Sequence, residues 1–268
     1  MTIVDAHVHV FADEIAPAAI ESVRTALERS GHTNALDGTV GALERSMDQC
    51  HVDRVVYLPL ATKSTQTEVL IQWSARLQER NPRFLCAGTL HPNNENYGEL
   101  IRRMKSLGLR GVKMHPVFQN FSVLDERIVE MFRACGEEGL PVVLHAGLDI
   151  LASKQADGSP TSLAKMLELC PETTFVAAHM GGSRQWDEVE SGLVGKEIYL
   201  DTSLACQLMD PAQFRRIVKK HGVHRILFGS DSPWCPQQQA IDFILSCGFS
   251  EQDQRQIFSE NALRVFSP

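Results

Sequence analysis

The sequence lacks the features that would direct it to a membrane or to nucleic acid. No uninterrupted apolar run approaches the length that crosses a bilayer, and the first residues lack the basic segment of a signal peptide. Positive charge is not in excess, because the formal net charge is -7. We therefore expect a soluble cytoplasmic protein whose partner is a small molecule, with neither nucleic acid nor membrane bound.

Paired cysteine motifs and a dinucleotide-binding loop are also missing. The seven cysteines are odd in number and none forms a Cys-x-x-Cys pair. We interpret them as reduced thiols, mostly buried as small apolar side chains, and expect neither a cysteine-based zinc site nor a disulfide framework. No Gly-x-Gly-x-x-Gly motif follows the first apolar segment, so the sequence does not favour a dinucleotide-binding fold.

What the sequence does contain is a regular alternation of short apolar segments and segments of helical periodicity. Short apolar strands separated by helices are typical of parallel β-structure buried on both faces. Eight such units in 268 residues, with no linker between them, favour one α/β domain over residues 1–268, a closed (β/α)8 TIM barrel. The predicted strands are 3–10, 54–60, 84–90, 111–115, 141–145, 173–179, 198–202 and 225–229.

The predicted helices follow these strands, and two long connections stand out. Segments 11–37 and 147–160 are expected to contribute substrate-facing loops, the first of them a candidate lid. The helices are predicted at 17–29, 41–49, 68–80, 99–107, 125–138, 162–169, 184–193, 211–220, 238–245 and 253–266.

The first predicted strand carries two histidines one residue apart. Strict alternation along a strand would place Asp5, His7 and His9 on one face. The other face would then carry the apolar residues Val4, Ala6, Val8 and Val10. Because two imidazoles on one strand face can converge on a single ion, this pattern is a candidate metal site.

Further ionisable residues end later predicted strands. The carboxyl ends of all strands open on one face of a barrel, so residues distant in sequence meet there. Several histidines with a carboxylate and no cysteine suit Zn²⁺, Mn²⁺ or Fe²⁺. Histidines 91 and 115 each precede a proline and could simply mark loop starts, and structural positions are expected for His32, His51, His221 and His224. The candidate site residues are Lys113, His115, His145, His179 and Asp231.

Five phrases of the sequence resemble the amidohydrolase-2 (amidohydrolase-related) family of the amidohydrolase superfamily. They are GVKMHP at 111–116, VVLHAG at 142–147, AAHMGG at 177–182, YLDTS at 199–203 and FGSDSPW at 228–234. The resemblance covers nearly the whole chain, including the closing IFSENALRVF at 257–266. It implies a metal-dependent TIM-barrel enzyme from a family whose members commonly form dimers or larger assemblies.

Residue by residue, the resemblance implies that His7, His9 and His145 are metal ligands. His179 would be a ligand of a second ion or a hydrogen-bonding catalytic residue, and Asp231 would contact the metal and carry protons. Lys113 would be either a carboxylated bridge between two ions or an unmodified lysine beside one ion. We expect zinc, with manganese and iron as alternatives.

The expected reaction is hydrolysis of an amide, ester or lactone carbonyl by a metal-activated water, with Asp231 as base and His179 or Lys113 stabilising the oxyanion. The alternative is non-oxidative decarboxylation of a small aromatic or muconate-like acid. A third interpretation is a barrel whose metal is only structural. Substrate contacts are expected from His115 with Gln119 and Asn120, from Arg184 with Trp186, and from Trp234, with Arg184 reading an anionic group.

Overall fold

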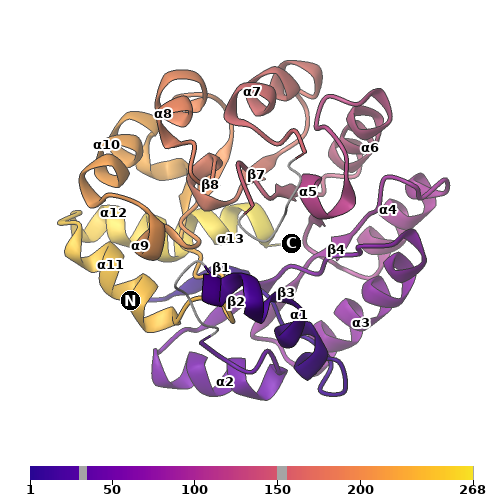
Figure 1. Cartoon of the computed structure of the whole chain (residues 1–268), viewed down its shortest axis with the longest axis horizontal. Helices are drawn as coiled ribbons and strands as arrows, with labels where there is room; N and C mark the ends of the chain where they lie inside the picture. The colour runs from indigo at the N-terminus through magenta and orange to yellow at the C-terminus, as the bar shows by residue number, and fades with distance from the viewer. Residues whose placement is uncertain (30–34, 150–155, 268) are drawn as a thin grey trace.

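Short parallel strands lie at the centre of the computed structural model, and helices surround them (Figure 1). The structure describes residues 1–29, 35–149 and 156–267. His32 and parts of the predicted loops 11–37 and 147–160 lie outside these ranges. The described strands are β1 (Val4–Val8), β2 (Arg54–Tyr57), β3 (Phe84–Cys86), β4 (Gly88–Thr89), β5 (Val112–Met114), β6 (Val142–Leu144), β7 (Phe175–Ala177), β8 (Tyr199–Asp201) and β9 (Ile226–Leu227).

The strands close into a ring, which confirms the predicted (β/α)8 barrel. Hydrogen-bonded neighbours run in the orders β1-β2-β3 and β4-β5-β6-β7-β8-β9, and all are parallel. Only Ala87 separates β3 from β4, so the two are halves of one barrel strand. The last gap is closed by Ala6 N, which donates to Phe228 O at 2.7 Å. The observed strands are shorter than the predicted ones because the residues at their ends turn into the loops.

Most helices begin and end close to the predicted residues. Helix α7 starts before the predicted residue 162 because Ser159 Oγ accepts a hydrogen bond from Ser162 N and Pro160 occupies the first turn. The four-residue helices α5 and α9 are too short to give a periodic signal. The described α-helices are α1 (Ala16–Arg29), α2 (Val40–Gln49), α3 (Thr67–Arg80), α4 (Tyr97–Ser106), α5 (Pro116–Gln119), α6 (Glu126–Glu137), α7 (Pro160–Leu169), α8 (Trp186–Glu188), α9 (Ala205–Leu208), α10 (Pro211–His221), α11 (Gln237–Ser246), α12 (Glu251–Arg255) and α13 (Asn261–Phe266).

Two predicted helices are interrupted by wider π-helical turns. The helix predicted at 184–193 starts two residues late, because Arg184 has a positive φ of 60°, and it consists of α8 followed by a π-turn at Val189–Leu193. The segment predicted as 253–266 contains α12, a π-turn at Gln256–Glu260 and α13. Such turns add one residue to a helical turn, a change that apolar periodicity alone does not reveal.

Apolar side chains form two clusters, one inside the barrel and one between the strands and the surrounding helices. Helix α13 contributes Ala262 and Phe266 to the inner cluster, and Figure 1 shows α13 reaching the middle of the ring. The outer cluster includes the inward faces of α2, α3, α4, α6 and α10. The remaining buried members of the inner cluster are Val4, Ala6, Val56, Leu58, Leu85, Ala87, Val143, Val176 and Leu227.

A bulge in β1 overturns the predicted assignment of its two faces. Asp5 pairs with Val55, but Val8 pairs with Tyr57. Between these two pairs β1 therefore contains one residue more than β2. The extra residue shifts the alternation by one. As a result Ala6 faces the inner cluster and Val8 the outer one. The prediction that Asp5 shares a face with His7 and His9 is wrong.

Asp5 instead joins β1 to the helix layer. Its Oδ2 accepts a hydrogen bond from Gln237 Nε2 of α11 at 2.9 Å and one from Ser230 Oγ at 2.6 Å. Gln237 Oε1 in turn accepts a hydrogen bond from Ser46 Oγ of α2 at 2.8 Å. This buried chain of hydrogen bonds ties β1, α2 and α11 together.

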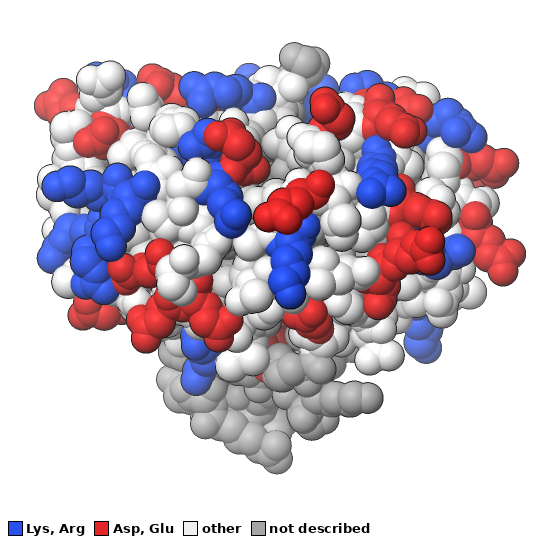
Figure 2. Space-filling view, turned by 90° about the horizontal axis from the view of Figure 1, so that it is seen from above, with Lys and Arg blue, Asp and Glu red and all other residues white. Residues whose placement is uncertain are grey.

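The outer surface agrees with the charge balance of the sequence. Lys and Arg side chains are interspersed with Asp and Glu side chains over the face drawn in Figure 2, without a continuous basic stripe. Among the residues that the structure describes, no helix combines the length and the apolar character needed to cross a bilayer.

The Asp5–Gln237–Ser46 chain predicts that Gln237→Ala lowers the free energy of unfolding by about 1–3 kcal/mol, because it leaves buried polar groups without partners. Gln238→Ala is the matched control, since Gln238 is the next residue of α11 and is exposed. Urea unfolding of both variants measures the difference. Equal stability of the two variants would contradict the role given to Gln237.

Candidate metal centre

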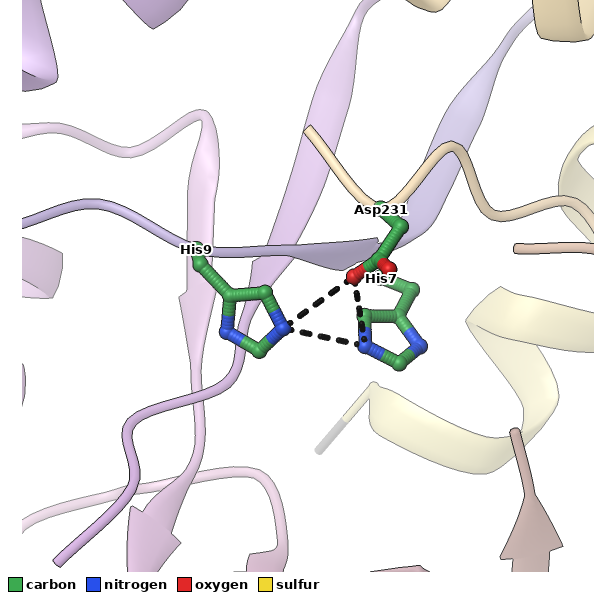
Figure 3. A group of neighbouring side chains, drawn as sticks. All are labelled: His7, His9 and Asp231. Atoms are coloured by element: carbon green, nitrogen blue, oxygen red, sulfur yellow. Dashed lines mark hydrogen bonds and ion pairs between the residues drawn. The ribbon is translucent and has the colours of Figure 1, made fainter. Parts of the chain in front are cut away.

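Three side-chain atoms from opposite ends of the chain form a nearly equilateral triangle (Figure 3). His7 Nε2 and His9 Nε2 are 3.2 Å apart, and each lies 3.2 Å from Asp231 Oδ1. Ligand atoms bound to one Zn²⁺ at about 2.1 Å lie roughly 3–3.5 Å from one another. The triangle therefore has the dimensions of one face of a metal coordination shell.

Hydrogen bonds on the far side of each imidazole decide which nitrogen carries the proton. His7 Nδ1 lies 2.8 Å from Asp201 Oδ2, and His9 Nδ1 lies 2.8 Å from the carbonyl oxygen of Leu58. Both acceptors require a protonated Nδ1, which leaves the lone pair of each Nε2 free. Two such lone pairs facing one carboxylate oxygen have no proton to share, and a cation between them satisfies all three atoms.

The ionisation states fit the same cation. Burial lowers the pKa of His7 to about 4, and the charge of Lys113 acts in the same direction, so His7 is neutral at neutral pH. Burial opposes ionisation of Asp231, but its interactions with His7, His9 and His179 hold its pKa at about 2. The site thus offers two neutral imidazoles and one carboxylate, a set that suits a divalent metal ion.

Asp201, at the end of β8, organises the site and was not among the residues predicted from the sequence. Its side chain is 0% exposed. Besides holding His7 through Oδ2, it accepts hydrogen bonds at Oδ1 from the backbone nitrogens of His179 at 3.1 Å and Ser203 at 3.0 Å. Burial would raise its pKa, but the charge and hydrogen bond of His7 keep it well below the ordinary value. Its position at a strand end, as for the other candidates, was the available signal.

His179 and His145 lie beside the triangle and contact each other. His179 Nε2 is 3.0 Å from His145 Nδ1, and His179 Nδ1 is 2.9 Å from Ser203 Oγ. The His179 ring centroid is 5.5 Å from that of His7 and 4.7 Å from that of His145. His145 Nε2 is buried and has no hydrogen-bond partner within the described residues, so it retains a donor atom for a ligand.

A second group of metal-type donors adjoins His145. The His115 ring stacks on the His145 ring at 4.0 Å, and Asp149 Oδ2 lies 3.2 Å from His115 Nε2 and 3.9 Å from His145 Nε2. These three residues form a separate candidate group, and Asp149 was missed because it lies in a loop with no pattern. The structure therefore divides the predicted ligands: His7, His9 and Asp231 share the triangle, His145 belongs to the second group, and His179 lies between them.

Lys113 is enclosed beside both groups, with 2% of its surface exposed. Burial lowers its pKa to about 8, against the opposing charges of Asp201, Asp231 and Asp149. Because a lowered pKa increases the fraction of neutral amine, Lys113 is more open to carboxylation than an exposed lysine, and it is also a usable cation near neutral pH.

The predicted substrate-binding residues occupy different places. Arg184 is exposed and lines a surface depression with Trp186 and Gln213. Trp186 Nε1 donates to His179 O at 3.1 Å, and Trp234 N donates to Asp231 O at 2.8 Å, so each tryptophan is hydrogen-bonded to the backbone of a site residue.

Gln119 and Asn120, two further residues of the predicted substrate region, differ in their surroundings. The Gln119 amide donates to the carbonyl oxygens of Ala61 and Leu90, which makes it a buried link between loops. Asn120 is exposed in a left-handed conformation at the end of α5.

Comparison with known proteins identifies the family of this chain. A family model described as amidohydrolase matches residues 4–267. The chain belongs to the amidohydrolase-2 family. No curated protein matches this sequence significantly.

Solved structures with the same fold include decarboxylases and a hydrolase. The 5-carboxyvanillate decarboxylase of Sphingomonas paucimobilis has 15% identity and a TM-score of 0.74, over 99% of this chain and 98% of that chain. A probable 2-pyrone-4,6-dicarboxylic acid hydrolase of Acinetobacter baumannii has 19% identity and a TM-score of 0.71, over 100% of both chains. A dihydroxybenzoic acid decarboxylase of Polaromonas, solved with bound manganese, has 17% identity and a TM-score of 0.72, over 99% of this chain and 96% of that chain. At these identities the likeness concerns the fold.

The triangle predicts that His7→Ala removes the bound metal ion, because one of three converging donor atoms is lost. His224→Ala is the control, since His224 is exposed and distant from the triangle in the connection before β9. Elemental analysis of both variants after dialysis measures the metal content. Unchanged occupancy in His7→Ala would remove His7 from the ligand set.

The hydrogen bond from His7 to Asp201 predicts a second effect. In Asp201→Asn the amide nitrogen replaces an acceptor at Nδ1 of His7, which favours the tautomer that carries its proton on Nε2. We expect metal affinity to fall about 10–100-fold, as for other residues that orient ligands. Competition with a chromogenic chelator measures the affinity, with Asp242→Asn on the surface of α11 as control. An unchanged dissociation constant would contradict the role of Asp201.

Proposed function

We propose that this protein is a metal-dependent hydrolase that attacks an amide, ester or lactone carbonyl of a small molecule. The observation that carries the proposal is the triangle of His7 Nε2, His9 Nε2 and Asp231 Oδ1. In both histidines a hydrogen bond at Nδ1 fixes the tautomer, so that Nε2 has a free lone pair. We assign zinc to this site, with manganese or iron as alternatives, since imidazole and carboxylate donors without thiolate suit all three. We also assign His145 as a metal ligand, through the buried Nε2 that faces the second group beside Asp149.

A divalent ion held here would supply Lewis acidity, which lowers the pKa of a water molecule from about 16 to about 7. The work of the chain is to position and move the proton. Asp231, ionised and buried at the triangle, is the group that we assign to accept the proton of the attacking water and return it to the leaving group. Its backbone nitrogen donates to His7 O at 2.9 Å, which keeps the carboxylate close to the ligand strand.

His179 and Lys113 are assigned to the carbonyl oxygen. Both are buried beside the triangle, and a charged or protonated donor in such a place stabilises a developing oxyanion more strongly than it would in water. His115, Arg184 and Trp234 are assigned to the rest of the substrate, with Arg184 facing an anionic group.

The number of ions depends on Lys113. As an unmodified cation it would repel a second ion, whereas carboxylation would turn it into a bridging ligand. We propose one ion per chain, with carboxylated Lys113 and two ions as the alternative. Elemental analysis with and without added bicarbonate distinguishes them, since only the two-ion form gains metal when bicarbonate is supplied.

Decarboxylation is the second candidate. It is favoured by the buried ammonium of Lys113 beside the triangle, which suits a substrate carboxylate, and by the decarboxylases among the similar solved structures. In this reaction Asp231 or His179 would protonate the carbon atom from which CO₂ departs, and no water would be consumed. The same residues would therefore serve both chemistries.

One assay separates the two reactions and also tests for a purely structural metal. The purified protein is stripped of metal, reloaded with Zn²⁺ or Mn²⁺, and given lactones, amides and hydroxylated aromatic carboxylates. Acid release that depends on the metal supports the hydrolase, and CO₂ release supports the decarboxylase. Restored folding stability on reloading, with neither product from the panel, would support a structural ion.

The assignment of Asp231 predicts that Asp231→Asn keeps much of the metal and loses about 10²–10⁴-fold in turnover, because the amide cannot accept the proton. Turnover and metal content are measured on the same sample, with Asp242→Asn as control. Full activity in Asp231→Asn would exclude Asp231 from the mechanism. Loss of metal together with activity would identify it as a ligand only.

A further inference from the structure

Two cysteine thiols are in contact where the chain leaves β8 and β9. Cys206 Sγ and Cys235 Sγ lie 3.3 Å apart and share a hydrogen bond. Cys206 belongs to α9, and Cys235 lies just before α11; Figure 1 shows these two helices side by side, and their residues are in contact. Both cysteines follow strands whose ends carry the candidate site, Asp201 in one case and Asp231 in the other.

The two thiols differ in ways that suit stepwise oxidation. Cys206 is half-buried and Cys235 is fully buried, so a reagent from solution meets Cys206 first. The hydrogen bond with Cys235 lowers the pKa of Cys206, and the same contact, together with burial, raises that of Cys235. Because the thiolate is the nucleophile, Cys206 is the attacking thiol and Cys235 the resolving one.

We propose that Cys206 and Cys235 are a modification site, a dithiol that a low-molecular-weight disulfide such as oxidised glutathione converts reversibly into a disulfide. The Cys206 thiolate attacks one glutathione sulfur, and the other glutathione leaves as a thiolate. Cys235 sulfur then attacks Cys206 sulfur, and its proton goes to the second departing glutathione. The protein loses two protons and two electrons, and one oxidised glutathione becomes two reduced ones.

The two sulfur atoms already lie close together. A disulfide bond is about 2.05 Å long, so the sulfurs must approach by only about 1.2 Å from their separation of 3.3 Å. The bond would join the segment whose Ser203 holds His179 to the segment that follows Asp231. Oxidation therefore clamps the two chain segments beside the site while leaving the ligand atoms unmodified.

The test uses the full-length protein, reduced and then incubated with oxidised glutathione under native conditions. After quenching and unfolding, alkylatable thiols are counted by mass spectrometry and the disulfide is mapped on peptides. We expect the count to fall from seven to five, with Cys206 linked to Cys235, and to return to seven with dithiothreitol. A count that stays at seven, a stable glutathione adduct on Cys206, or a disulfide between other cysteines would overturn the proposal.

Three variants make the result specific. Cys50→Ser is the matched control, since Cys50 is the other half-buried cysteine, and it should lose two thiols as the wild type does. Cys206→Ser should lose none, and Cys235→Ala should stop at a glutathione adduct on Cys206. An intramolecular disulfide in either of these last two variants would contradict the assignment of the pair.

Discussion

The hydrogen bond between His7 Nδ1 and Asp201 Oδ2 is the interaction on which the candidate site depends. It fixes the proton of His7 on the far side of the ring, which makes Nε2 a lone-pair donor that faces Asp231. The same carboxylate also accepts from the backbone of His179 and Ser203. One buried carboxylate at the end of β8 thus orients His7 from β1 and His179 from the turn after β7, so these two side chains keep a fixed position relative to each other.

The bulge in β1 allows both halves of this short strand to point the required side chains into the barrel. Its first half must fill the barrel interior with apolar side chains, and its second half must present imidazoles to the same interior near the mouth. An unbroken alternation beginning from Val4 and Ala6 would send His7 outward, toward the helices. The extra residue between the paired positions of β2 turns His7 inward while Asp5 still bonds to Gln237 of α11.

Much of the fold could be predicted from the sequence because helical periodicity, strand composition and the repeated order of units are local properties. The strand-end positions of His7, His145, His179 and Asp231 followed from that order. The bulge could not be predicted, since register depends on hydrogen bonds to β2 rather than on the residues of β1 themselves. Asp201 was not predicted because nothing in the sequence distinguishes it from other polar residues at strand ends. Cys206 and Cys235 are 29 residues apart in the chain, and their contact depends on the pairing of the two strands that precede them.

Closure of the barrel also has a consequence for synthesis. Asp5 bonds to Ser230, 225 residues later, and β1 has no partner on one edge until the segment after β9 has been made. A nascent chain emerging from the ribosome therefore carries His7 and His9 long before it carries Asp231. The triangle of His7, His9 and Asp231 cannot assemble before Asp231 has been made, so it forms only when almost the whole polypeptide has been synthesised.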